Sequence, residues 1–191
     1  MTTPAIDPAR VYGVQLQARR RLFDWVRPLT HAQYIRPYPF GLATLQATLL
    51  EIAGTEFYLT ARLEGGPLPP VAEWPIGETR QPAFSDLEAV WEPQMRRVQA
   101  VLDRTTDWDR EVTSEIRWPD RVVTVTATKA DIATQLLLHD VHHRAQAMAI
   151  LRQLGVPAQD LDYIGFVQRR SVRPDQTKAQ NDGASGIDAD P

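Results

Sequence analysis

The chain of 191 residues contains no cysteine. This absence excludes disulfides, thiolate metal sites and a cysteine nucleophile, and it fits a reducing compartment. The sequence also has no run of about 18 consecutive apolar residues, so neither a membrane-spanning segment nor a membrane partner is expected. The N-terminus lacks the basic and apolar regions of a signal peptide. We therefore expect a cytoplasmic protein.

The chain also lacks an excess of positive charge. The 21 Lys and Arg residues are outnumbered by 24 Asp and Glu residues, which gives a formal net charge of −3, and the basic residues are scattered. No nucleic-acid partner is therefore expected, because such partners require a basic surface. The apolar fraction of 43%, in contrast, is close to the globular average, and 191 residues suffice for one domain with a sizeable core.

The pattern of apolar residues predicts an all-α fold with four long helices and a small β-hairpin before the last of them. Prolines and glycines mark the breaks between these elements. Helices are expected over residues 7–27, 42–64, 85–104 and 128–155, and a hairpin over residues 110–128, where β-branched residues are frequent.

Local signals refine these boundaries. Ser85 is expected to cap the third long helix, and Thr128 the fourth, where Asp131 completes a pattern similar to a capping box. Pro93 lies inside the third helix, so that helix either kinks there or begins its regular part just before it. Residues 28–41 contain three prolines and are expected to form a loop.

The end of the chain differs in composition from the rest. Beyond about Ser171 it is polar, with almost no apolar residues. Such a segment cannot bury enough apolar surface to offset the entropy of ordering, so we expect disorder. The predicted organisation is one helical domain over residues 1–170 and a disordered polar tail over residues 171–191.

Histidine is scarce but concentrated. The chain has four histidines, and three of them fall within residues 139–143. His139 and His143 are spaced i, i+4, which places both rings on one face of a helix. Two imidazoles so placed can share one metal ion. His142 lies about 60° from His139, on the side away from His143, so we expect it to pack beside the site.

A third ligand would have to come from another helix, and the second long helix offers two carboxylates. Periodicity alone buries Glu56 and gives Glu51 a more polar setting. Either one, facing His139 and His143, would complete a site of two imidazoles and one carboxylate. The alternative is a pair of core histidines that hydrogen-bond to Glu51 and Gln146 without a metal.

The histidine cluster also resembles a known family. HisAspValHisHisArgAlaGln (residues 139–146), followed by LeuArgGlnLeuGly, is similar to the last long helix of the DinB/YfiT-like superfamily. This resemblance implies a four-helix bundle, often dimeric, with a divalent metal held by three histidines. The family's first metal histidine lies in the second long helix, where this chain has Glu51. On this resemblance we favour Glu51 over Glu56 as the third ligand. The small Ala145 replaces a glycine of the family pattern.

The resemblance implies a divalent-metal-dependent enzyme of the thiol-dependent transferase or isomerase type, or of the hydrolase type. The predicted metal ligands are Glu51, His139 and His143, and zinc or nickel is expected ahead of iron or manganese. His142, Gln146 and Tyr58 are expected as neighbours that contact the ligands or the substrate. The expected partners are a second copy of the chain and a low-molecular-weight thiol or another small molecule.

A non-catalytic alternative remains open. The chain would then be a DinB-like stress or binding protein that keeps the fold with a degenerate or empty metal site. The glutamate at position 51, where the family has histidine, is the feature that favours this alternative.

Overall fold

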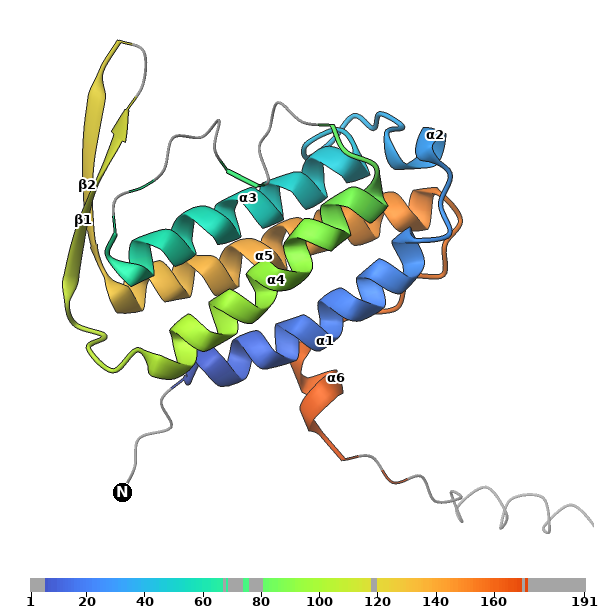
Figure 1. Cartoon of the computed structure of the whole chain (residues 1–191). Coiled ribbons are helices and arrows are strands. Elements are labelled where there is room, and N and C mark those ends of the chain that lie inside the picture. The colour runs from blue at the N-terminus through green and yellow to red at the C-terminus, as the bar shows by residue number, and fades with distance from the viewer. Residues whose placement is uncertain are drawn as a thin grey trace, which may run out of the picture.

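The computed structural model describes residues 6–66, 68, 74–75, 81–117, 120–169 and 171. The described part is mostly helical, with four long helices and one small antiparallel hairpin. Figure 1 shows the long helices lying alongside one another. The long helices are α1 (Pro8–Val26), α3 (Leu45–Glu64), α4 (Phe84–Arg104) and α5 (Lys129–Gln153), and the short ones are α2 (His31–Tyr34) and α6 (Tyr163–Val167). The strands are β1 (Glu111–Arg117) and β2 (Val122–Thr128).

Side-chain caps fix the starts of three long helices. Asp7 accepts a hydrogen bond from the backbone of Ala9 at the start of α1. Thr128 accepts one from Asp131 at the start of α5, as the sequence predicted. The cap of α3 is Thr44, so this helix begins at Leu45, three residues later than expected. The difference arises because the chain turns at residues 41–44, where two backbone φ angles are positive.

The prediction that Ser85 caps the third long helix is wrong. The helix α4 begins one residue earlier, at Phe84, and its flanking residue Ala83 provides no side-chain cap. Asp86 in the first turn places a negative charge near the helix N-terminus instead, where it is favourable. Pro93 is exposed and lies within α4, which continues on both sides of it.

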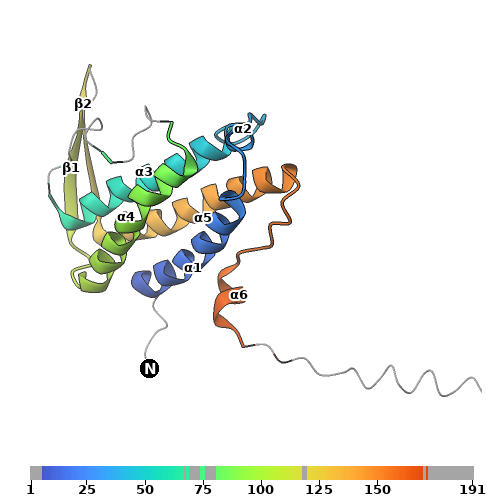
Figure 2. The same ribbon diagram turned by 45° about the vertical axis from the view of Figure 1, so that its right-hand side comes forward.

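The long helices bury their apolar faces against one another. Helix α3 packs along α5 and α4, and α1 packs along α4 and α5. Figure 2 shows the same side-by-side arrangement after a turn of 45°. The largest fully buried apolar side chains come from α1, α3, α4 and α5, and include Phe23, Leu49, Trp91, Leu102 and Ile132.

A buried network of charges also joins the helices. Arg19 of α1 pairs with Glu56 of α3 and with Asp140 of α5, each at 2.7 Å. Asp140 also pairs with Arg144 at 2.7 Å, and all four residues are at least 93% buried. Trp91 of α4 donates a hydrogen bond to Glu56. Glu56 and Arg144 thus make structural ion pairs.

The hairpin precedes α5 as predicted. Its strands pair antiparallel from Glu111 opposite Thr128 to Arg117 opposite Val122. The helices α2 and α6 were not predicted. The expected disordered tail lies, apart from Ser171, outside the described residues. Among the described helices, none combines the length and the apolar character that a membrane span requires.

Candidate metal centre

Glu51 of α3 and two histidines of α5 converge where these two helices pack together. The potential ligand atoms of Glu51, His139 and His143 all lie within 4.8 Å of one another. The Nε2 atom of His139 lies 3.3 Å from Oε1 of Glu51, and the centroids of the two imidazole rings are 4.4 Å apart. The structure therefore brings together the three residues that were predicted as metal ligands.

Helix periodicity explains why these residues meet. The i, i+4 spacing stacks His139 and His143 on the face of α5 that contacts α3. On α3, Glu56 points into the buried charge network, and Glu51 therefore points elsewhere, with 32% of its side chain exposed. The site is thus enclosed by two helices and still accessible from solvent.

The ionisation states suit a ligand set. The hydrogen bond with His139 lowers the pKa of Glu51, with further help from Thr55, and these effects outweigh the opposing effect of partial burial. Partial burial lowers the pKa of His143, although its hydrogen bond with Gln146 acts in the opposite direction. At neutral pH the site therefore contains an anionic carboxylate and a neutral His143 imidazole. These are the protonation states that metal binding requires.

Gln146 orients the imidazole of His143. The Nδ1 atom of His143 lies 3.0 Å from Oε1 of Gln146. A carboxamide oxygen only accepts hydrogen bonds, so Nδ1 carries the proton and Nε2 keeps its lone pair. A hydrogen bond of this kind on the distal nitrogen is the usual support of a metal-ligating histidine.

The turn before α3 approaches the same glutamine. A Cβ atom placed on Gly41 would lie only 3.1 Å from Oε1 of Gln146, and the φ angle of Gly41 is +55°. Both observations favour glycine at this position. The expectation of a loop over residues 28–41 does not predict this contact. The single available signal was Gly41 itself, shortly before the start of the helix.

The structure places His142 beside the cluster and Tyr58 away from it, farther along α3. His142 is exposed, its ring meets that of His143 edge-on with centroids 4.7 Å apart, and its Nε2 accepts a hydrogen bond from Gln146. Tyr58 stacks on Trp74 with centroids 6.1 Å apart, about two turns along α3 from Glu51. Contacts of these two residues with a substrate stay predictions.

The donor set fits a divalent cation. Zinc bonds of about 2.0–2.1 Å in tetrahedral geometry place neighbouring donor atoms about 3.3 Å apart. The separation between His139 Nε2 and Glu51 Oε1 has this value. His143 lies on the next turn of the same helix, and one of its ring nitrogens lies within 4.8 Å of a ligand atom of each of the other two residues. Three protein ligands would leave at least one coordination position open.

The fold and the cluster define a class: mostly helical proteins with imidazole and carboxylate groups gathered between two long helices. The sequence matches the DinB family over residues 1–178, and the chain belongs to this family. The crystal structure of a DinB-like protein of Bacillus subtilis, YjoA, is similar, with a TM-score of 0.52 and 16% sequence identity. The similarity covers 84% of this chain and 99% of that one, and it supports the fold. No curated protein matches the chain in sequence.

Proposed function

We propose that the chain is a divalent-metal-dependent enzyme whose cation is held by Glu51, His139 and His143 within a four-helix bundle. The observation that carries this proposal is the convergence of three potential ligand atoms within 4.8 Å, from two helices that the core holds together. Membership of the DinB family supports a metal at this place. We also expect a homodimer, on the family resemblance alone.

The chemistry of such a site follows from the coordination position that the three protein ligands would leave open. A divalent cation would lower the pKa of a thiol or water bound in the open position, so that the corresponding anion is available at neutral pH. The partly exposed side chain of Glu51 and the exposed His142 lie on the side from which a small substrate would enter. Transfer or isomerisation with a low-molecular-weight thiol, or hydrolysis, is the corresponding reaction class.

Glu51 tunes this chemistry. A carboxylate in place of an imidazole lowers the net charge of the metal site by one unit, so the cation polarises its open ligand less strongly. Zinc and nickel accept this donor set, and two imidazoles with one carboxylate also suit iron or manganese. Gln146 keeps the His143 ring in the tautomer that binds a cation, and it occupies the position expected of a residue that supports a ligand.

A titration of chelator-treated protein with zinc tests the metal site. We expect one zinc per chain, and at least a tenfold loss of affinity in His139→Ala and in Glu51→Gln. The control is His31→Ala, because His31 is exposed on α2 and has no part in the cluster. An affinity for zinc that is equal in wild type and in His139→Ala would refute the proposal.

The thiol part of the proposal needs a separate measurement. Cobalt substituted for zinc would report a sulfur ligand through a near-ultraviolet charge-transfer band. We expect this band when a small thiol such as 2-mercaptoethanol is added to the cobalt-loaded protein. A cobalt-loaded protein whose spectrum does not respond to thiols would leave hydrolysis as the remaining reaction class.

A non-catalytic binding protein is the second candidate. The observation that favours it is that Glu51, His139 and His143 each already have a polar partner within the protein. Glu51 interacts with His139 and accepts a hydrogen bond from Thr55, and His143 pairs with Gln146. In this case wild type would bind zinc weakly, and Glu51→His would strengthen binding.

A further inference from the structure

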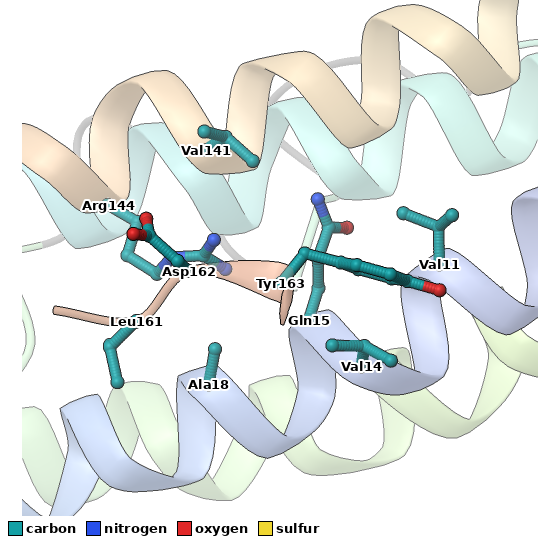
Figure 3. A pocket seen from close by; sticks show the side chains of 9 residues that line it. All are labelled: Val11, Val14, Gln15, Ala18, Val141, Arg144, Leu161, Asp162 and Tyr163. Carbon is teal, nitrogen blue, oxygen red and sulfur yellow. The ribbon is translucent and has the colours of Figure 1, made fainter. Parts of the chain in front are cut away.

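A pocket lies on the side of α5 that faces away from the candidate metal centre. It has a volume of about 170 Å³ and opens between α1, α5 and the segment that leads into α6 (Figure 3). Its α5 wall contains Val141 and Arg144, which lie about 200° and 140° around the helix from His139. The pocket is therefore separate from the candidate metal centre, and none of the three candidate ligands lines it.

The walls of this pocket are mostly apolar. Val14, Ala18 and Leu161 line it and are at most 7% exposed, whereas Val141 and Tyr163 on its rim are 46% and 39% exposed. A buried apolar floor with an open rim is the usual form of a small-molecule site. The volume suits a molecule of about one aromatic ring, because an apolar cavity of about 150 Å³ can hold benzene.

One polar group in the wall lacks a partner. Gln15 is 4% exposed, and its Nε2 donates a hydrogen bond to the backbone oxygen of Leu137 at 2.8 Å. Its Oε1 is sealed from solvent and has no hydrogen-bond partner in the described part of the chain. Figure 3 shows the amide nitrogen turned toward α5 and the oxygen turned toward the side of Val11. Buried oxygens of this kind nearly always accept a hydrogen bond, so this one indicates a missing donor.

The charged group at the pocket does not select the ligand. Arg144 is paired with Asp140 at 2.7 Å, and Asp140 also pairs with Arg19. Together with Glu56, these residues form a network of two positive and two negative charges, and the remaining charged residue of the wall is the exposed Asp162, so the wall has no positive charge to offer an anion. The selective group is thus the neutral amide of Gln15.

We propose that this pocket binds a small, mainly apolar molecule of about one ring that carries a single hydroxyl or amine donor, which Gln15 Oε1 accepts. The ligand would enter past Tyr163, whose side chain lies at the exposed rim (Figure 3). Its apolar part would contact Val14, Ala18 and Leu161.

Phenol and toluene are suitable probes, because they have nearly the same shape and only phenol can donate a hydrogen bond. Their binding to the full chain can be followed by NMR through the methyl resonances of Ala18 and Leu161. We expect both to bind, and phenol to bind roughly three- to tenfold more tightly, which corresponds to one net hydrogen bond. In Gln15→Met, which keeps the length of the side chain, this preference should disappear.

A variant at the rim shows whether binding occurs in this pocket. Val141 is nearly half exposed, so Val141→Trp can fill the mouth without disturbing the core, and it should abolish binding of both probes. The proposal is overturned if neither probe shifts the Ala18 and Leu161 resonances, or if wild type binds phenol and toluene equally. Phenol binding that survives in Val141→Trp would place the ligand elsewhere and would overturn it as well. Zinc affinity should be the same in all these variants, which separates this test from that of the metal centre.

Discussion

Gln146 is the residue on which the geometry of the candidate metal centre most depends. Its amide oxygen pairs with Nδ1 of His143, and its amide nitrogen donates to Nε2 of His142, both at 3.0 Å. The backbone at Gly41 approaches the same oxygen closely. One side chain therefore fixes the tautomer of a candidate ligand, contacts its neighbour His142 and lies against the turn before α3.

Replacing this glutamine tests that role. We expect Gln146→Leu to weaken zinc binding about 10- to 100-fold, the usual effect of removing a residue that orients a metal ligand. The matched control is Gln135→Leu, an exposed position one turn before His139 on the same face of α5, where no change is expected. Isothermal titration with zinc measures both. Equal affinities in Gln146→Leu and wild type would mean that His143 either needs no support or is not a ligand.

The sequence allowed part of this site to be predicted, for identifiable reasons. The pairing of His139 with His143 follows from helix periodicity, which depends only on local spacing. The choice of Glu51 over Glu56 needed the family resemblance, and burial of Glu56 against Arg19 agrees with that choice. The close approach of Gly41 could not be predicted, because it depends on how two distant segments pack.

Among the helices, the buried charges hold α3 and α5, which carry the candidate ligands, in register. Glu56 follows Glu51 by five residues on α3, and Asp140 follows His139 directly on α5. Each helix therefore presents a candidate ligand on one face and a carboxylate of the charge network on another. Arg19 of α1 binds both carboxylates at 2.7 Å, so it limits the rotation of α3 and α5 relative to each other.

Breaking the network should be costly. In Asp140→Asn, Arg19 and Arg144 keep their charges but lose the carboxylate between them. Removal of one partner from a buried ion pair typically destabilises a protein by about 3–5 kcal/mol. The control is Asp103→Asn on the exposed side of α4, where a change within about 0.5 kcal/mol is expected. Urea denaturation measures both free energies of unfolding, and a loss below about 1 kcal/mol in Asp140→Asn would contradict the proposed role.

The long elements of the fold were predictable and the short ones were not. The four long helices and the hairpin follow from apolar periodicity and β-branched residues, which persist over many positions. The four residues of α2 and the five of α6 are too short for a periodic signal. A signal for α2 was nevertheless present, because Thr30 and Gln33 form a capping box. The predicted cap at Ser85 is wrong because a suitable cap residue does not by itself start a helix.

At the scale of the whole molecule, the segment after α5 completes the core. Leu161 is 4% exposed and belongs to the same apolar cluster as the main helices, with Phe166 packed against it. The guanidinium of Arg21 on α1 also lies 5.0 Å from the ring centroid of Phe166. The helical domain therefore includes α6, and we propose that it ends near residue 170.

Two truncations test this boundary. Removal of residues 172–191 should leave the melting temperature unchanged within about 1 °C, because so polar a segment cannot bury much apolar surface. Removal of residues 161–191 also deletes Leu161 and Phe166, so their apolar contacts with the core are lost. Losing the burial of one large apolar side chain costs about 1.5–3 kcal/mol, so losing two of them should lower the melting temperature by roughly 6–24 °C in a domain of this size. Calorimetry measures both, and a large decrease on removal of residues 172–191 alone would show that the domain extends beyond residue 170. Zinc affinity should be unchanged by the shorter deletion, since α3 and α5 supply the three candidate ligands.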